Sequence, residues 1–288
     1  MNRERSVGQT KENRLKIKNL CIIAGAGDLP VYALDEAVKR NIPFRVYVLD
    51  DTNEALIKSL ESLKTDWQKI SLGRFDEILK KLRADQITHA MIVGKVSKKN
   101  FLSSISFNMK TLAILKKAKN FNDASLFELV AAEFKKIHVE IIKQDAFLKA
   151  LLCPPGIYSR RKPDKKELAD IDFGMDFAKR IALLDIGQTA VVAGKTLLAV
   201  EAVEGTDEAI RRGGAYARKS PGVVCKAMRK NQDTRFDVPT VGLQTVETMR
   251  QNNCRVLAIE AGHTFVADRE ALVQKINEYK MVFVAVKL

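Results

Sequence analysis

Short apolar runs alternate with helical spacings along most of this 288-residue chain, and this alternation constrains its fold more than any other feature. Strands joined by helices pair in parallel, and the helices then cover the faces of the sheet. The chain is also long enough for two domains that each bury a core. The sequence therefore predicts an α/β protein built from two α/β domains.

The first half shows the alternation most clearly. We expect strands at 20–24, 44–49, 90–93 and 139–142, and helices at 31–40, 53–63, 74–82, 108–115 and 125–135. This order predicts a Rossmann-like domain with a mainly parallel sheet. In the second half we expect helices at 165–184, 245–251 and 269–278, a hairpin of strands 189–193 and 197–203, and strands at 223–226, 240–243, 256–260 and 282–286.

A proline-rich break separates the two halves. The run Cys153-Pro-Pro-Gly156 interrupts any helix or sheet, and a polar stretch continues to Pro163. The expected organisation is a flexible basic tail at 1–18, an N-terminal α/β domain at 19–152, a linker at 153–164 and a C-terminal α/β catalytic domain at 165–288. Pro-rich linkers are semi-rigid, so two such domains can close on a ligand without collapsing together.

Glycines follow two of the expected strands in the first half. Gly25-Ala-Gly27 lacks the third glycine of the dinucleotide fingerprint, and no acid further along the chain fits that motif. One interpretation is a tight strand-to-helix turn; the other is a turn whose backbone N–H groups meet a phosphate or ribose. Gly94-Lys95 is a similar case, since Lys95 either contacts substrate or is simply exposed.

Acidic and basic residues concentrate at 185–239, beside strand signals. In Asp233-x-Arg235-x-Asp237, an extended chain puts all three side chains on one face. Pro239 favours an extended chain before it. Two carboxylates around a guanidinium form either a self-satisfied surface ladder or a pair of metal ligands with an arginine placed for phosphate.

Further charged residues of this stretch stand at strand and helix ends. Glu201 lies among apolar residues of the expected strand 197–203, so its charge needs a partner. Thr206 is placed to cap a following helix with Asp207 in its first turn, which is also how an ordinary helix starts. The nearby cations have two interpretations: they bind a diphosphate together, or they are solvated surface charges. They are Arg211, Arg212 and Lys226.

The chain carries a net charge of +14. A basic surface suits nucleic acid, an anionic membrane or an acidic small substrate, or it only keeps the protein in solution. Aromatic residues make up only 7% of the chain, so we expect no nucleic-acid partner.

Four widely spaced cysteines without a C-x-x-C pair fit a reducing cytosol. We find neither a membrane-spanning apolar run nor a signal peptide.

Several motifs occur together in the order of one known family. They are Asp185-Ile-Gly-Gln188, Val203-Glu-Gly-Thr-Asp207 followed by arginines, Thr234-Arg-x-Asp-x-Pro-Thr240, and, outside that stretch, Ile23-Ala-Gly-Ala-Gly-Asp-Leu-Pro30, Gly94-Lys-Val-Ser97 and Glu260-Ala-Gly262. With this combination, the chain resembles the LpxI-type UDP-2,3-diacylglucosamine pyrophosphatases over nearly its whole length.

The resemblance implies hydrolysis of the pyrophosphate bond of UDP-2,3-diacylglucosamine. The products are UMP and 2,3-diacylglucosamine 1-phosphate (lipid X), in a step of lipid A biosynthesis in Gram-negative bacteria. The resemblance also implies Mg²⁺ or another divalent cation, a substrate held between two domains, water attack on the phosphorus nearer the sugar, and a homodimer. We expect a cytoplasmic protein that binds the anionic cytoplasmic face of the inner membrane peripherally and transiently.

Carried over by motif, the essential acid of the family falls on Asp237. The further catalytic candidates are Asp233, Arg235 and Lys226, which would orient or offset charge on the reacting phosphates. The expected oxygen ligands of the cation are Asp237, Glu201, Glu204 and Asp207. The candidate substrate-binding residues are Gly25, Gly27, Lys95, Gln188, Thr206, Arg211 and Arg212.

Two rival functions stay open at this point. One is a phosphotransferase that acts on another nucleotide diphosphate, and the other is a non-catalytic nucleotide or nucleic-acid binding module. Magnesium-dependent release of UMP favours the enzyme. Strongly salt-dependent binding to duplex DNA without hydrolysis favours the binding module.

Overall fold

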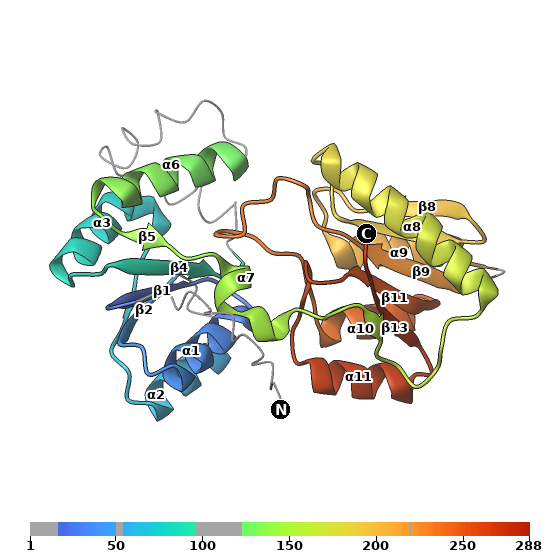
Figure 1. Ribbon diagram of the computed structural model, residues 1–288, viewed down its shortest axis with the longest axis horizontal. Coiled ribbons are helices and arrows are strands. Elements are labelled where there is room, and N and C mark those ends of the chain that lie inside the picture. The colour runs from blue at the N-terminus through green and yellow to red at the C-terminus, as the bar shows by residue number, and fades with distance from the viewer. Residues whose placement is uncertain (1–16, 50–53, 96–122, 219) are drawn as a thin grey trace, which may run out of the picture.

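The structure is a computed structural model that describes residues 17–49, 54–95, 123–218 and 220–288 (Figure 1). It contains two α/β domains, which confirms the predicted fold class. The predicted helix at 108–115 and nearly all of the predicted tail at 1–18 lie outside the described residues. In the part of the chain that is described, no helix is long and apolar enough to cross a membrane.

The first domain is built on a wholly parallel sheet with strand order β3-β2-β1-β4-β5. Its strands are β1 (Leu20–Ala24), β2 (Phe44–Val48), β3 (Trp67–Lys69), β4 (His89–Val93) and β5 (Glu140–Ile141). Its longer helices are α1 (Leu29–Lys39), α2 (Glu54–Ser62), α3 (Phe75–Ala84) and α6 (Asp123–Lys136). The short strand β3 escaped prediction because it has only three residues and none of them is fully buried.

Helices cover both faces of this first sheet. Leu20 and Ile22 of β1 pack with α1 and α2 in one apolar cluster. Cys21 and Ile23, which point to the other face, pack with α3 and α6 in a second cluster. The strand is therefore buried on both sides, and this is why it reads as a continuous apolar run in the sequence.

The second domain has a mixed sheet with strand order β6-β13-β11-β9-β7-β8. Its strands are β6 (Gly156–Ile157), β7 (Thr189–Ala193), β8 (Thr196–Val200), β9 (Gly222–Lys226), β11 (Cys254–Glu260) and β13 (Val282–Val286). Strands β9, β11 and β13 are parallel, whereas the predicted β7–β8 hairpin and β6 add antiparallel edges. A separate parallel pair joins β10 (Thr240–Val241) to β12 (Phe265–Val266).

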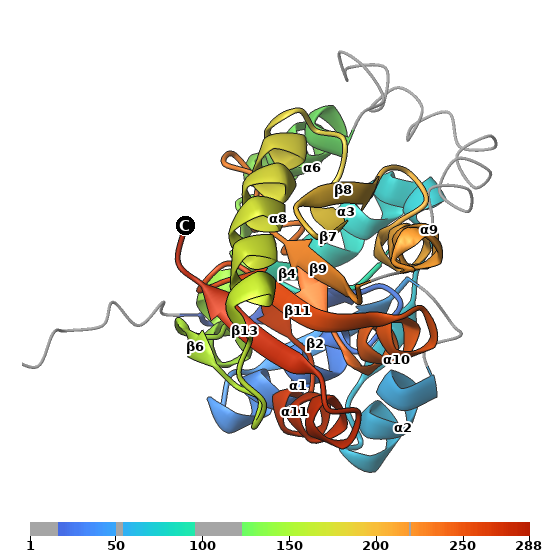
Figure 2. The same ribbon diagram turned by 90° about the vertical axis from the view of Figure 1, so that its right-hand side faces the viewer.

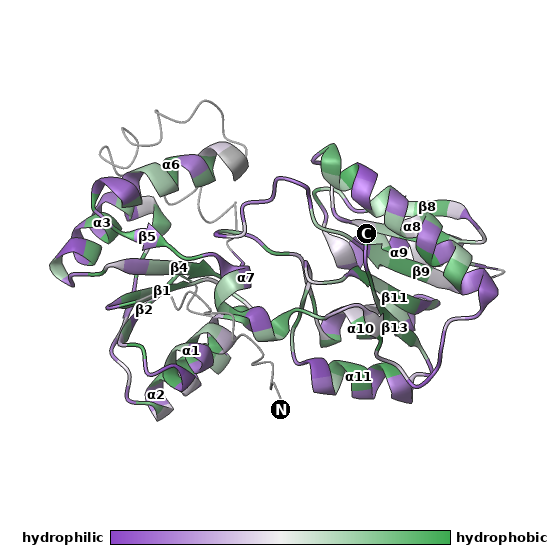
Figure 3. Cartoon of the chain, viewed as in Figure 1, coloured by the Kyte–Doolittle hydropathy of each residue, from purple (hydrophilic) through white to green (hydrophobic). Residues whose placement is uncertain are grey.

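Helices also cover both faces of the second sheet (Figure 2). They are α8 (Lys165–Leu183) on one face, and α9 (Thr206–Tyr216), α10 (Leu243–Gln251) and α11 (Arg269–Glu278) on the other. Along α8 and α11, hydrophobic and hydrophilic bands alternate, as amphipathic helices on a sheet require (Figure 3). Helix α8 starts where the sequence predicts, because Asp164 and Glu167 form a reciprocal capping box.

The chain passes from one core to the other within two residues. Leu152 packs against a cluster of the first domain, and Cys153 is buried in a cluster of the second. The expected linker 153–164 includes β6, which pairs with β13, and the Tyr158 N–H donates to the Phe283 carbonyl at 2.9 Å. The expected linker is thus attached to the second sheet through β6.

One loop of the second domain, residues 227–239, packs onto the first domain (Figure 1). The Gln144 N–H, just beyond β5, donates to the Thr234 carbonyl at 2.8 Å. Phe236 stacks on Phe127 of α6 with ring centroids 4.5 Å apart. Val238 is buried within a core cluster of the first domain. The 227–239 loop therefore joins the two domains through polar and aromatic contacts.

At Gly174, helix α8 lies too close to the sheet to leave room for a side chain. A Cβ at this position would lie 2.5 Å from Cys225 Sγ and 2.9 Å from Val192 Cγ2. A Gly-to-Ala change inside a helix usually raises the free energy of unfolding by about 1 kcal/mol, whereas overpacking a core lowers it by roughly 1–3 kcal/mol. We expect Gly174→Ala to lower the free energy of unfolding by about 1 kcal/mol in urea titrations. Gly156→Ala, where the nearest atom lies 3.9 Å away, is the control; an equal effect of both changes would contradict the packing explanation.

Candidate functional site

Charged residues of the second domain gather at one edge of its sheet. Strand β9 ends at Lys226 and the parallel strand β11 ends at Glu260. Thr189 begins the antiparallel strand β7 opposite Lys226, and Glu201 follows the end of β8. The carboxyl edge of parallel strands is where open α/β sheets bind ligands. The 227–239 loop begins at this same edge.

Lys226 and Glu201 form the buried centre of this edge. Lys226 is 5% exposed, and its Nζ lies 2.6 Å from Thr206 Oγ1 and 3.3 Å from Thr189 Oγ1. Glu201 Oε2 lies 3.7 Å from the same Nζ, while Glu201 Oε1 accepts from Thr206 at 3.0 Å. Burial alone would raise the pKa of Glu201, but the Lys226 charge and the two hydroxyl donors outweigh it and hold the pKa below its ordinary value.

This arrangement corrects two predictions. The strand β8 ends at Val200, so Glu201 does not continue the expected strand 197–203, and Val203 is fully exposed. Gly205, with φ of +89°, is the N-cap of α9, so Thr206 is the first helical residue and does not cap the helix. Its hydroxyl instead joins Lys226 to Glu201, a role that depends on tertiary contacts and has no local signal.

The predicted extended face Asp233-x-Arg235-x-Asp237 is wrong. Residues 234–236 form a turn, in which the N–H groups of Phe236 and Asp237 both donate to the Asp233 carbonyl. Arg235 instead forms a two-pronged ion pair with Asp233, with the shortest contact at 2.6 Å. The hydrogen bond from Arg235, more than any other influence, lowers the pKa of Asp233. For this pair, the self-satisfied alternative is the one observed.

Asp237 is exposed and belongs to a chain of amide contacts. Gln232 Nε2 donates to Asp237 Oδ2 at 2.6 Å, and the buried Gln188 donates through Nε2 to Gln232 Oε1 at 3.0 Å. The predicted residues Gln188 and Asp237 are thus connected, through a residue that sequence reasoning missed. Gln232 stands five residues before Asp237, a spacing that carries no signal for contact.

The two arginines of α9 form ion pairs with glutamates of the same domain. Arg212 pairs with Glu204 and also donates to the Val200 carbonyl at 2.7 Å. Arg211 pairs with Glu208 at 2.8 Å on the exposed side of the helix. Both guanidinium groups thus have acidic partners within the second domain, and a joint clamp of Arg211, Arg212 and Lys226 stays a prediction.

Glycines of the first domain lie where β1 and β4, the central neighbours of the parallel sheet, both end. Ala26 and Lys95 exchange two backbone hydrogen bonds of 2.8 Å, and the Gly25 N–H donates to the Val93 carbonyl at 2.8 Å. A Cβ at Gly25 would lie 2.4 Å from the Lys95 carbonyl oxygen. The expectation that the N–H groups after β1 stay available for phosphate is therefore wrong for Gly25 and Ala26. The side chain of Lys95 is exposed.

Comparison with known proteins assigns both domains to one family. The model of the LpxI N-terminal domain matches residues 19–151, and that of the LpxI C-terminal domain matches residues 154–284. The UDP-2,3-diacylglucosamine pyrophosphatase LpxI of Caulobacter vibrioides (strain ATCC 19089 / CIP 103742 / CB 15) is 32% identical over 266 residues, which cover 89% of this chain and 93% of that protein.

The chain belongs to the LpxI family. The carboxylates expected to hold a metal in this LpxI-family chain do not come together. Within the described ranges, no three His, Cys, Asp or Glu side chains are close enough to hold a metal ion. Glu201 pairs with Lys226, Glu204 pairs with Arg212, and Asp207 stands in the first turn of α9. In the described residues, the predicted ligands Asp237, Glu201, Glu204 and Asp207 do not form one cluster, and a divalent cation with its ligands stays a prediction.

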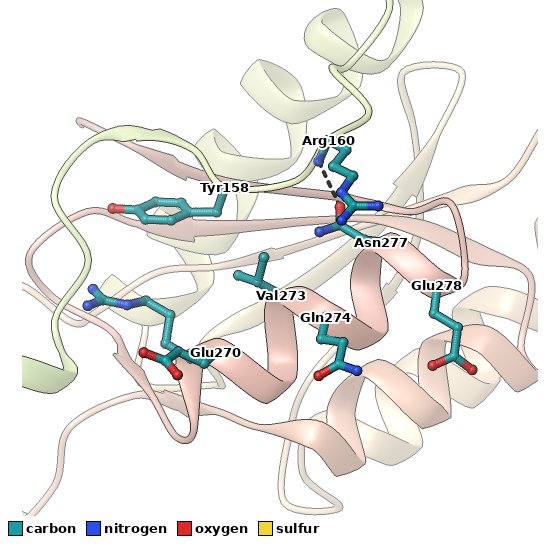
Figure 4. A pocket seen from close by; sticks show the side chains of 8 residues that line it. Tyr158, Arg160, Glu270, Val273, Gln274, Asn277 and Glu278 are labelled. Carbon is teal, nitrogen blue, oxygen red and sulfur yellow. Dashed lines mark hydrogen bonds between the residues drawn. The ribbon is translucent and has the colours of Figure 1, made fainter.

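A surface groove of about 640 Å³ lies on α11 and the segment after β6 (Figure 4). Tyr158, Arg160 and Arg269 line it together with polar side chains of α11, and the Arg160 N–H donates to Asn277 Oδ1 at 2.7 Å. None of the sequence-predicted site residues lines this groove. The candidate site of this chain is thus the sheet edge with the 227–239 loop, and not this groove.

The Lys226–Glu201 pair predicts how stability depends on pH. Glu201→Gln leaves the Lys226 ammonium buried without a counter-charge, so at pH 7 we expect a loss of about 3 kcal/mol in the free energy of unfolding. The pKa of Glu201 is lower in the folded protein than in the unfolded chain, where a glutamate has a pKa of about 4.3. The ionised carboxylate therefore contributes its full stabilisation of the fold above about pH 4.3. The difference between wild type and variant should therefore shrink as pH falls from about 4.3 through the folded pKa.

Urea titrations between pH 7 and pH 3 measure this difference. Glu208→Gln is the control, because its ion pair with Arg211 is solvent-exposed and contributes little. A difference between wild type and Glu201→Gln that stays constant over the whole range would contradict the assigned pairing.

Proposed function

We propose that this LpxI-family protein hydrolyses the pyrophosphate bond of UDP-2,3-diacylglucosamine to UMP and 2,3-diacylglucosamine 1-phosphate (lipid X), a step of lipid A biosynthesis. The observation that carries the proposal is the 32% identity to a UDP-2,3-diacylglucosamine pyrophosphatase over 89% of the chain. The geometry supports it, since an exposed carboxylate, Asp237, stands on a loop that contacts both domains.

Asp237 is the proposed essential acid. Its carboxylate is exposed, and the amide of Gln232 fixes its direction. Mg²⁺ in proteins is usually bound by one or two carboxylates together with substrate phosphates and water. Asp237 alone fits that ligand set when the substrate diphosphate supplies the remaining oxygens, whereas a cage of four carboxylates does not. The cation, when bound, would offset the charge of the diphosphate and activate water.

Arg235 is the proposed cation for the phosphates. It lies on the same turn as Asp237, and Asp233 holds its guanidinium in a fixed orientation with two parallel contacts. Arg235 would then stabilise charge that develops on the transferred phosphoryl group.

Lys226 has a different proposed role. Its charge is offset by Glu201, so it fixes the starts of β7 and α9 instead of neutralising the substrate.

The substrate is proposed to lie between the carboxyl edges of the two sheets. Gly25, Gly27 and Lys95 stand beside the point where the strand order of the first sheet reverses, between β1 and β4. Doubly wound sheets bind ligands at that point. Gln144 relates this edge to the 227–239 loop, because it donates to both the Ile92 and the Thr234 carbonyls.

The net charge of +14 supports a second part of the proposal. A diacylated substrate resides in a membrane, and basic residues are attracted to an anionic bilayer surface. We therefore propose a cytoplasmic protein with transient, peripheral binding at the inner membrane. A homodimer stays a prediction that derives from the family resemblance alone.

The test is incubation of the purified protein with UDP-2,3-diacylglucosamine and Mg²⁺ in ¹⁸O-labelled water, with a chelator in a parallel sample. We expect UMP and lipid X, with the label in lipid X, and no products with the chelator until Mg²⁺ is added back. Transfer of a phosphoryl-containing group to an acceptor without label would favour the phosphotransferase. No cleavage with any divalent cation would exclude the proposed hydrolysis.

Asp237→Ala should remove most of the activity. Loss of one group that stabilises transition-state charge typically costs a factor of about 100 or more in kcat. Because Asp237 is exposed, we expect the variant to keep its melting temperature and its binding of lipid X. Asp176→Ala, which removes an exposed acid of α8 paired with Arg180, is the matched control. Turnover near the wild-type rate in Asp237→Ala would show that the site is assigned to the wrong residue.

A further inference from the structure

We infer that Lys179 and Glu260 form a clamp that holds the base of the 227–239 loop and thereby positions Asp237. Neither residue carries a role in the site described above. The inference rests on the proposed function, because it assigns to this pair the placement of the proposed essential acid. Both are positioning residues, since they act through the loop and not on the substrate.

The contacts of the clamp converge on the backbone of one loop residue, Met228. Glu260 Oε1 accepts from Lys179 Nζ at 2.6 Å, and Glu260 Oε2 accepts from the Met228 backbone N–H at 2.7 Å. Lys179 Nζ also donates to the Met228 carbonyl at 3.0 Å. The backbone N–H and C=O of Met228 are therefore both bound by one ion pair, two residues after β9 ends.

The elements of the second domain place these side chains. Glu260 is the last residue of β11, which pairs in parallel with β9, and it is 5% exposed. Lys179 lies in the penultimate turn of α8, which packs on β9 and β11. A helix and the neighbouring strand thus hold the chain at the point where it leaves the sheet.

The burial of Glu260 indicates a requirement beyond stability: its side chain is 7% exposed, whereas that of Lys179 is 31% exposed. Removing a carboxylate charge from water is costly, and well-packed apolar residues often stabilise a fold as well as a buried ion pair does. An apolar pair, however, cannot bind a backbone N–H and a backbone C=O. Here the charges fix the direction in which the loop departs, and that direction decides where Gln232 and Asp237 lie.

The other end of the loop is fixed by the first domain. Gln144 binds the Thr234 carbonyl, and Phe236 stacks on Phe127. Gln232 therefore lies between two attachments, the clamp at Met228 and the first domain at Thr234, and Asp237 directly follows Phe236. A release of the clamp would remove both backbone contacts of Met228, while Ala227 still donates to the Gln188 carbonyl at 2.9 Å and Arg229 still pairs with Asp185 at 2.6 Å. The base of the loop would then be held less tightly than its tip, and the Gln232–Asp237 contact would lose part of its fixed geometry.

The double variant Lys179→Met with Glu260→Gln tests the clamp without leaving a buried charge unpaired. Arg180→Met is the matched control, because Arg180 is the next residue of α8 and its ion pair with Asp176 is exposed. Lys179→Arg keeps the positive charge and is the conservative variant. The full-length protein is used throughout.

Two measurements separate positioning from general stability. Amide hydrogen exchange of peptides that cover 226–237 should become faster in the double variant, while exchange in β7, β11 and α10 stays unchanged. Because a misplacement of about 1 Å costs up to a factor of roughly 100, kcat should fall by about 10- to 100-fold with KM changed less than about threefold. Arg180→Met should leave both measurements unchanged. Lys179→Arg, which keeps the positive charge, should retain most of the wild-type protection of the loop peptides against hydrogen exchange.

Unchanged exchange in the loop peptides would overturn the clamp. Faster exchange in the loop with wild-type kcat would overturn its role in positioning Asp237, and faster exchange in every strand would show a merely structural pair. The exchange measurement needs no substrate. Absence of hydrolysis by the wild-type protein would therefore refute the proposed function, while the loop peptides would still test the contacts.

Discussion

The attachment of one loop to the edges of two sheets is the constraint on which the rest of the structure depends. Parallel strands bring their carboxyl ends to one edge, so each domain presents its chain turns there. The 227–239 loop leaves this edge of the second domain and ends its course against the first. The contacts of Thr234 and Phe236 add to the burial of Val238 and Phe265 in a core cluster of the first domain and to the bridge between Leu152 and Phe265.

Two ion pairs at the edge of the second sheet hold the strand ends from which the 227–239 loop departs. Lys226 with Glu201, and Lys179 with Glu260, are two ion pairs placed at the ends of neighbouring strands β9 and β11. Each pair contains a glutamate that is mostly shielded from water, and each is completed by hydroxyl or backbone hydrogen bonds. Such pairs add little net stability but tolerate few alternative arrangements of the surrounding chain. The edge is therefore a fixed frame, from which the more exposed Gln232 and Asp237 project.

The exposed polar groups around Asp237 contrast with that frame. Asp233 and Arg235 satisfy each other, and the amides of Gln188 and Gln232 connect the sheet edge to the Asp237 carboxylate. The proposed chemistry requires a carboxylate that is oriented but still accessible to a diphosphate and a hydrated cation. Asp237 is exposed, and Gln232 orients its carboxylate.

Local patterns were sufficient for most helices and strands. The capping box at Asp164 and Glu167, the hairpin around Gly194-Lys195 and the apolar runs of β1 and β9 depend on neighbours in the sequence, so the sequence by itself determined them, along with the α/β class and the family motifs. Only the tertiary structure decided the partners of the charged residues. Lys226 and Glu201 are 25 residues apart, and Lys179 and Glu260 are 81 apart, and no periodicity relates residues at such separations. The extended prediction for Asp233 to Asp237 failed for a different reason: the Asp233 side chain accepts from the backbone N–H and the guanidinium of Arg235, a local alternative to extended chain, and the contact of Thr234 with the first domain holds the turn in place.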